Sequence, residues 1–264
     1  MLLSVDLNCD MGESFGAWRM GNDAALMDYV SSVNVACGFH AGDASVIRKT
    51  IETAIEKNVA VGAHPSFPDL QGFGRRAMKM SASEIFDIML YQVAALKGMC
   101  EALGGKLHHV KPHGALYNQA ATDKTLAEAI TKAVKTIDGN LIFYGLANSF
   151  LISEAERIGL KTASEVFADR TYQADGTLTA RTEPNALIET TGKSCEQVLE
   201  MITAQTVTAT NGEKISIKAD TVCIHGDGAH ALEFARAIHR TLDEKGVSVN
   251  AIKGSAGFRI KVEL

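Results

Sequence analysis

The 264-residue chain is predicted to fold as an α/β protein, a single (β/α) barrel domain over residues 1–264. Runs rich in β-branched and aliphatic residues alternate with helical patterns from end to end, and short connections join them. This alternation indicates a parallel sheet with helical crossovers. Seven or eight such units fit a barrel better than an open sheet, although alternation alone does not decide whether the sheet closes.

Eight short apolar runs are predicted to be buried strands because each is four to eight residues long and rich in Val, Ile, Leu or Phe. The first, LLSVDLN, has a β-rich composition, and the later runs resemble it. The predicted strands are residues 2–8, 32–36, 59–62, 107–110, 141–145, 160–167, 220–225 and 247–252.

Helices are predicted between these strands from the 3.6-residue spacing of apolar side chains. Helix 81–103 shows the pattern best, and Ser81 with Glu84 forms a capping box at its start. Ser194 and Gln197 repeat this motif at another predicted start. The predicted helices are residues 22–31, 43–57, 81–103, 123–137, 147–158, 194–206 and 229–245.

Composition and charge disfavour several functional classes. The net charge is −5, and no run of Lys and Arg forms a basic stripe, so neither nucleic acid nor an anionic membrane is the expected partner. No apolar run approaches the roughly 20 residues of a membrane span. Asp6 interrupts the apolar start before a signal peptide forms. We therefore expect a cytoplasmic protein.

The five cysteines are odd in number and show no C-x-x-C spacing. A disulfide framework and a thiolate zinc site are therefore both disfavoured. Cys9 and Cys37 lie near the polar residues and are candidate nucleophiles. Cys9 shares strand parity with Val5 and Leu7, however, so packing is the favoured interpretation for it.

Polar side chains alternate with apolar ones along the first strand, where Asp6, Asn8 and Asp10 share one face. Both faces of a parallel sheet are buried, so these groups must be paired, liganded or exposed to a wet cleft. For Asp6, a hydrogen-bonded network within the core and a role in a functional site are equally favoured interpretations.

Further polar clusters follow the other strands, each at a carboxyl end. A single histidine there is usually structural, but four in corresponding positions with carboxylates favour an active site at the C-terminal face of a barrel. The clusters are His40 and Asp43, His64, Lys111 and His113, Glu165 with Asp169 and Arg170, and His225 with Asp227.

Other chemistries have weaker support. Neither a Walker pattern nor a G-x-S-x-G elbow is present, and GFGRR at 72–76 lacks the third glycine of a dinucleotide fingerprint. Arg75, Arg76, Arg170 and Lys111 are the candidate phosphate ligands, and a solvated rim is the favoured interpretation for Arg76. The segment 167–181 has an Asp-Gly turn between polar flanks and is predicted to be a hairpin or flap on a βα loop.

The blocks DLNCDMGESFG, NVACGFHAGD, GAHPSFPDLQGFGRR, VKPHGALYN, EVFADRTYQADGTL and HGDG together resemble the LamB/YcsF family, in order and over nearly the whole chain. The resemblance implies the A subunit of a bacterial 5-oxoprolinase, which opens 5-oxo-L-proline to L-glutamate while ATP becomes ADP and phosphate. It also implies partner subunits B and C. The implied fold is a barrel of the glycoside hydrolase/deacetylase type, usually with seven strands.

The residues fit this chemistry as hypotheses. Asp10 or His64 is the candidate general base, Lys111 and Arg170 are candidates to hold carboxylate or phosphoryl oxygens, and the remaining histidines are candidate proton donors. The expected catalytic residues are Asp10, His40, His64, Lys111, His113, Asp169 and His225. The expected substrate-binding residues are Asn8, Glu13, Asp43, Arg75, Arg170 and Asp227.

Two alternatives remain open. Related barrels include carbohydrate deacetylases whose metal is held by one Asp and two His, and Asp10, His64 and His113 are the matching set here. Such a metal-dependent hydrolase acts alone and without ATP. The second alternative is a chain that only binds a small molecule or scaffolds its partners, which the number of converging titratable groups disfavours.

Overall fold

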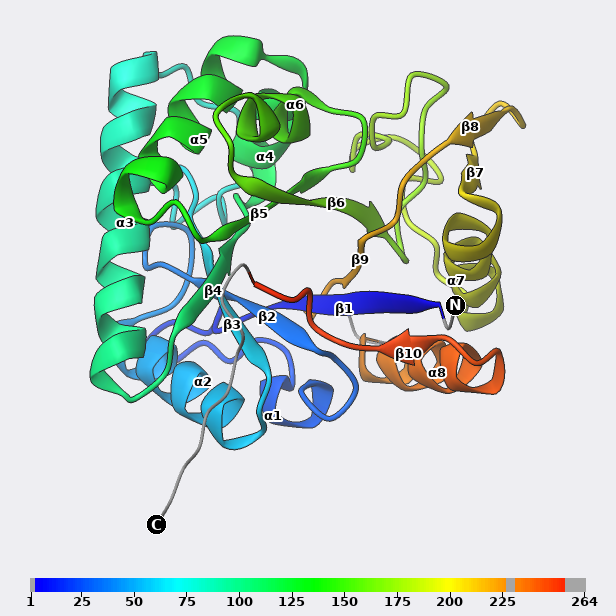
Figure 1. The fold of residues 1–264 in the computed structure, drawn as a ribbon, viewed down its shortest axis with the longest axis horizontal. Helices are drawn as coiled ribbons and strands as arrows, with labels where there is room; N and C mark the ends of the chain where they lie inside the picture. The colour runs from blue at the N-terminus through cyan, green and yellow to red at the C-terminus, as the bar shows by residue number, and fades with distance from the viewer. Residues whose placement is uncertain (1–2, 227–230, 255–264) are drawn as a thin grey trace.

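The computed structural model describes residues 3–226 and 231–254. Seven parallel strands pair in chain order, and the last pairs with the first, so the sheet closes into a barrel. They are β1 (Ser4–Met11), β2 (Ser32–Ala36), β3 (Ala60–His64), β4 (Leu107–Val110), β5 (Ile142–Leu146), β6 (Lys161–Phe167) and β9 (Thr221–Ile224). Figure 1 shows helices ranged around this barrel. The predicted seven-stranded (β/α) barrel is confirmed.

The eighth predicted strand lies outside the barrel. It is the short β10 (Ser248–Val249), which pairs in parallel with the start of β1. A separate antiparallel hairpin of β7 (Thr206–Thr208) and β8 (Lys214–Ser216) was missed, because strands of three residues give little periodicity.

Eight α-helices lie in the described part of the chain: α1 (Asp23–Leu26), α2 (Ala44–Glu56), α3 (Ala82–Ala102), α4 (Gly114–Thr122), α5 (Lys124–Ile137), α6 (Phe150–Arg157), α7 (Thr191–Leu199) and α8 (Ala231–Glu244). A π-helical turn, Glu200–Ala204, continues α7. None of the helices described combines the length and apolarity that crossing a bilayer requires.

The capping box predicted for α3 is confirmed. Ser81 accepts a hydrogen bond from the backbone N–H of Glu84, whose carboxylate accepts one from the N–H of Ser81. The second box is wrong, because α7 begins at Thr191 and so contains Ser194 and Gln197. Ser194 instead donates to the carbonyl of Ala168, and Gln197 to that of Phe167, which fastens the loop after β6 to this helix.

The predictions missed α4, which separates β4 from α5. Asp123 ends α4 and caps α5 by accepting from the N–H groups of Thr125 and Leu126. Only Asp123 separates the two helices, and the apolar periodicity of α5 is much stronger, so the shorter α4 was not recognised as a helix of its own. Helix α4 matters for the site because it begins directly after His113.

The interior of the barrel is polar. Asp6, Asn8 and Asp10 lie on the inner face of β1, and its apolar side chains, Cys9 among them, pack outward, as the alternation predicts. Asp6 accepts hydrogen bonds from Ser32 at 2.8 Å, Thr221 at 2.6 Å and Tyr144 at 3.0 Å. Asp6 therefore belongs to a satisfied core network, whereas Asp10, four residues further along the strand, reaches the other end of the barrel.

Candidate active site

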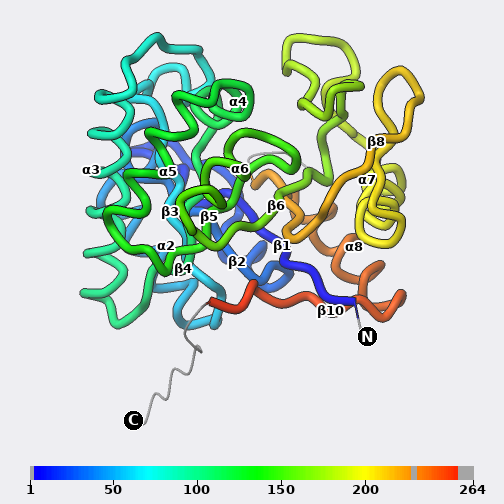
Figure 2. Tube along the Cα trace, turned by 45° about the horizontal axis from the view of Figure 1, so that its top comes forward, coloured from blue at the N-terminus to red at the C-terminus, as the bar shows by residue number. Residues whose placement is uncertain are grey.

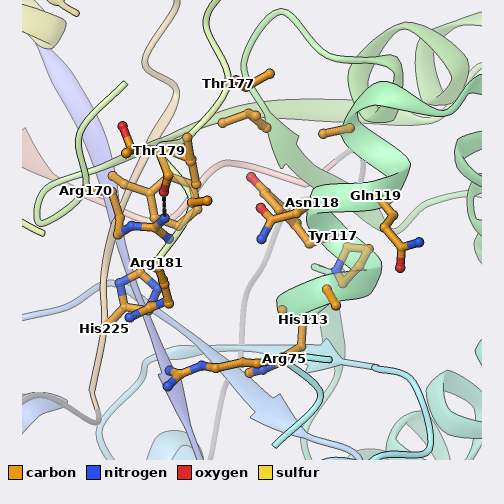
Figure 3. A pocket seen from close by; sticks show the side chains of 18 of the residues that line it. Arg75, His113, Tyr117, Asn118, Gln119, Arg170, Thr177, Thr179, Arg181 and His225 are labelled. Atoms are coloured by element: carbon orange, nitrogen blue, oxygen red, sulfur yellow. Dashed lines mark hydrogen bonds between the residues drawn. The ribbon is translucent and has the colours of Figure 1, made fainter. Parts of the chain in front are cut away.

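A cavity of about 710 Å³ opens at the carboxyl ends of the barrel strands. Helix α4 and the segment 167–181 flank it, and both lie near the top of the view in Figure 2. Figure 3 shows side chains from both flanks pointing into it. Its polar lining includes Asp10, Glu13, His64, Arg75, Lys111, His113, Tyr117, Asn118, Arg170, Arg181 and His225.

Lys111 forms the charged floor of this cavity. Its ammonium Nζ lies 2.9 Å from Oδ1 of Asp10 and 2.8 Å from Oε1 of Glu165, and it also donates to Oδ1 of Asn8 at 3.2 Å. Burial alone would lower the pKa of Lys111, but the two carboxylates raise it well above the usual range. Lys111 is therefore a fixed positive charge at neutral pH.

Asp10 is held as the carboxylate. Burial would raise its pKa, but His64 and Lys111 outweigh burial and lower the pKa well below the usual range. Its Oδ1 accepts from Asn34 at 2.8 Å as well as from Lys111, and its Oδ2 lies 3.3 Å from Nε2 of His64. Asp10 thus links the floor of the cavity to a group of histidines.

Three histidines and a glutamate gather beside Asp10. Nδ1 of His113 lies 3.2 Å from Nε2 of His64, and the rings of His40 and His113 stack with centroids 3.9 Å apart. Burial and the neighbouring histidines lower the pKa values of His40 and His113 well below the usual range, so both rings are neutral at pH 7. Neutral imidazoles donate poorly to a leaving group, but they are good metal ligands.

Two sets of potential metal ligands occur among the described residues. One is Glu13, His40, His64 and His113, and the other is Asp10, Cys223 and His225; within each set the ligand atoms lie within 4.8 Å of one another. Burial, with Lys111 opposing it, leaves the pKa of the Cys223 thiol well above the usual range. A thiol that stays protonated is a poor ligand, so the first set is the better metal site.

Asp169 and His225 form a pair on the opposite wall. Nδ1 of His225 donates to the carboxylate, 2.8 and 2.9 Å from its two oxygens. Burial would raise the pKa of Asp169, but His225 and Arg181 lower it, so the acid stays ionised. Because Nδ1 donates to Asp169, Nε2 is the ring nitrogen left to accept a proton, which is the arrangement of a general acid–base pair.

The segment 167–181 folds as the predicted hairpin. Gln173 N–H donates to the carbonyl of Thr177 at 2.8 Å, and Tyr172 pairs with Leu178. The buried Arg170 holds this flap in place by donating to the carbonyl of Thr179 at 2.5 Å, the bond drawn in Figure 3. Burial and the nearby Arg181 lower the pKa of Arg170 to about 10. Arg170 therefore has a structural part as well as lining the cavity.

Some predicted site residues lie elsewhere. Asp43 caps α2, accepting from Ser45 and Val46, and also accepts from Gly16. Arg76 pairs with Asp69 on the exposed rim, in line with the favoured interpretation. Asn8 lies beneath the cavity, bonded to Thr221 and Asn34. Asp227 is outside the described residues.

Three of the polar residues named in the cavity lining, Tyr117, Asn118 and Arg181, were not assigned a role from the sequence. Tyr117 donates to Glu165 at 2.7 Å, one helical turn after His113, so recognising α4 would have found it. Arg181 lines the cavity from the flap, and its position beyond the Asp-Gly turn was the available signal. Figure 3 shows Arg181 close to His225, with Arg75 below them.

Comparisons with known proteins show what the chain resembles. A protein from Tolumonas auensis, named as the A subunit of 5-oxoprolinase, is 58% identical over 251 residues, covering 95% of this chain and all of that one. A protein of the same name from Bacillus subtilis is 55% identical, covering 95% and 98%. The crystal structure of a lactam utilization protein from Thermus thermophilus superposes with a TM-score of 0.89 at 42% identity, covering 95% and 100%.

The family assignment rests on nearly the whole length of the sequence. The sequence model of the LamB/YcsF family matches residues 5–257, a range that holds every predicted site residue. The chain belongs to the LamB/YcsF family.

Proposed function

We propose that this chain is the A subunit of an ATP-dependent 5-oxoprolinase, with residues 1–264 as its single catalytic domain. It opens the lactam of 5-oxo-L-proline to L-glutamate while ATP becomes ADP and phosphate, together with subunits B and C, in the cytoplasm. The names of its relatives support the substrate. The observation that carries the chemistry is the Asp169–His225 pair facing a cavity floored by Lys111.

A lactam resists water because its nitrogen is a poor leaving group and its carbonyl is stabilised by resonance. Transfer of the terminal phosphoryl group of ATP to the lactam oxygen makes the ring carbon electrophilic. Water then adds, the ring C–N bond breaks as its nitrogen gains a proton, and a second water hydrolyses the resulting acyl phosphate. Two water molecules are consumed, and the products are glutamate, ADP and phosphate.

His225 is the proposed general base for the first water. The carboxylate of Asp169 accepts the Nδ1 proton, so Nε2 can take a proton from water and then deliver it to the ring nitrogen. Asp10, one of the two bases predicted from the sequence, is a weaker candidate because Lys111 and Asn34 already occupy Oδ1 and depress its basicity. His64, the other, is enclosed by His113 and Asp10.

Positive charge in the cavity matches the anionic reactants. The substrate carries a carboxylate and the phosphorylated intermediate adds further charge, and Arg75, Arg181 and Lys111 lie in the cavity lining. The planar guanidinium groups can bind carboxylate or phosphoryl oxygens in pairs. Lys111 already faces Asp10, Glu165 and Asn8, so its proposed part is to hold the two carboxylates in place, and the guanidinium groups are the expected ligands of the anionic oxygens.

The alternative of a metal-dependent deacetylase acting alone has less support. It requires Asp10, His64 and His113 as ligands, with one position open to water. Oδ1 of Asp10 is already bound by Lys111 and Asn34, and a fuller donor set that omits Asp10 lies beside it. The ATP-dependent hydrolysis of a lactam is therefore the favoured function.

The test is release of glutamate and ADP from 5-oxoproline and ATP, measured with this chain alone, with subunits B and C alone, and with all three. We expect both products, in equal amounts, only from the complete mixture. His225→Gln in the mixture should abolish most of the turnover, whereas His239→Gln on α8, outside the cavity, should not. Full glutamate release by this chain without ATP would refute the proposal.

A further inference from the structure

The cluster of Glu13, His40, His64 and His113 is not used by the proposed acid–base pair. Each residue comes from a different connection: the loop after β1, the loop after β2, the end of β3 and the residue before α4. All four side chains are buried, with His40 and His64 each 1% exposed. Burying three imidazoles together requires that their nitrogens find partners.

The hydrogen bonds of two of these histidines fix where their protons lie. Nδ1 of His64 lies 2.8 Å from the carbonyl oxygen of Lys111, and Nε2 of His113 lies 3.0 Å from that of Phe73. A carbonyl only accepts, so each of these nitrogens carries the ring proton. When the two rings carry no further proton, the other nitrogens, Nε2 of His64 and Nδ1 of His113, present lone pairs.

Those two lone pairs face each other. Nε2 of His64 is 3.2 Å from Nδ1 of His113, and Oδ2 of Asp10 lies 3.3 Å from the same Nε2. Acceptors this close repel one another unless a cation lies between them. Either a proton or a metal ion would satisfy the arrangement.

His40 distinguishes these two possibilities. Neither of its ring nitrogens has a hydrogen-bond partner among the described residues, although the ring is buried against His113. Its Nε2 lies 3.5 Å from Oε1 of Glu13. A proton shared by His64 and His113 leaves His40 without a partner, at a cost of about 1–3 kcal/mol. A metal ion bound by all three rings gives one of the two His40 nitrogens a partner.

The spacing of the donors also fits a metal. A tetrahedral zinc site with Zn–N distances of about 2.0–2.1 Å has ligand atoms about 3.3–3.4 Å apart. The corresponding distances here are 3.2 Å between His64 and His113, 3.5 Å between His40 and Glu13, and 3.6 Å between His113 and Glu13.

We propose that Glu13, His40, His64 and His113 bind one divalent transition-metal ion, of which Zn²⁺ is the type. Three imidazoles with one carboxylate suit zinc and its neighbours, whereas Mg²⁺ and Ca²⁺ prefer oxygen ligands. The carbonyls of Lys111 and Phe73 act as outer partners that orient two of the rings. Four protein ligands make a closed site, which fastens the connections of the barrel mouth together and supplies no metal-bound water.

The test measures metal binding directly and does not depend on turnover. The purified chain is stripped with a chelator, reconstituted with Zn²⁺ and desalted, and bound metal is measured by mass spectrometry. We expect about one equivalent, together with a rise in the thermal unfolding temperature. Co²⁺ in place of Zn²⁺ should give the intense visible bands of four-coordinate cobalt.

Three variants identify the ligands. His40→Gln should lose the metal, Asp10→Asn should keep it, and His239→Gln on α8 is the matched histidine control that should keep it too. Circular dichroism checks that each variant folds, and Glu13→Gln replaces His40→Gln if that variant does not. Less than about a tenth of an equivalent in the wild type overturns the proposal and leaves the shared proton as the explanation. Loss in Asp10→Asn with retention in His40→Gln overturns the ligand set.

The outcome is independent of the proposed lactamase reaction. Metal binding without glutamate release from the complete mixture would refute the function but uphold the site. Turnover by a complete mixture whose wild-type chain retains less than about a tenth of an equivalent of metal after reconstitution would uphold the function but refute the site.

Discussion

Replacing Lys111 with methionine removes the ammonium that lies between Asp10 and Glu165 and keeps a side chain of similar length. Both carboxylates would remain in the barrel, where Glu165 is 0% and Asp10 7% exposed. Breaking a buried ion pair typically costs about 3–5 kcal/mol, because an uncompensated charge stays behind. Two carboxylates lose their partner here, so we expect the upper part of that range at pH 7.

This loss should be plain in urea denaturation and in heating. In a domain of this size each kcal/mol lowers the unfolding midpoint by roughly 2–4 °C, so a fall of roughly 10–20 °C is expected. Lys97→Met is the matched control, because Lys97 pairs with Glu101 on the surface of α3 and such pairs contribute at most about 0.5 kcal/mol.

Two further measurements separate lost charge from lost packing. Without Lys111 the buried carboxylates bind protons more tightly in the folded than in the unfolded state, so the destabilisation should shrink as the pH falls. Adding Glu165→Gln to Lys111→Met should also recover part of the stability, since one orphaned charge is gone. A destabilisation below about 1 kcal/mol at pH 7, or one that does not change with pH, would contradict the reasoning.

Three other predictions follow from the site and its supports. Asp169→Asn should lower kcat of the assembled enzyme by about 10²-fold or more, because the carboxylate orients His225, and should leave KM for ATP nearly unchanged. An equal loss of kcat in the capping variant Asp43→Asn would argue against this. Burial lowers the pKa of His109 well below its usual range, so the unfolded chain takes up a proton first as pH falls below about 6.5. Stability should be fully present above that pH and decline below it, by up to about 1.4 kcal/mol per unit from this ring, and His109→Gln should show a shallower decline in urea titrations at stepped pH. Asp43→Ala should cost about 1 kcal/mol by removing the cap of α2, without changing KM for 5-oxoproline; a KM effect as large as that of Arg75→Ala would return Asp43 to the substrate site.

The barrel could be predicted from the sequence because its strands are apolar runs of suitable length and the parity of Asp6, Asn8 and Asp10 marks the inward face. The convergence of His64, Lys111 and His225 followed from the shared edge of parallel strands. What the sequence does not contain is register between distant strands. That register decides that Lys111 meets Glu165, and that Asp169 meets His225.

Local sequence patterns gave wrong predictions where the same residue type at the same spacing suits two different structural roles. Asp43 follows a glycine and precedes a helix, which suits a cap as well as a ligand, and the structure shows the cap. Ser194 and Gln197 have capping spacing but lie inside α7, because the helix begins a turn earlier to fasten the loop after β6.

The closure of the barrel has a consequence for how the chain folds as it is made. Strand β1 needs β9 as its second neighbour, and the hydrogen bond from Thr221 to Asp6 joins residues 215 positions apart. The nascent chain therefore completes β2 to β6 while one edge of its first strand is still unpaired. Contacts of such high sequence separation slow folding, and the intermediates that form meanwhile have unpaired strand edges and are prone to aggregate. The barrel closes only when β9, in the last fifth of the polypeptide, has been made. Chains truncated before this strand should therefore aggregate during synthesis.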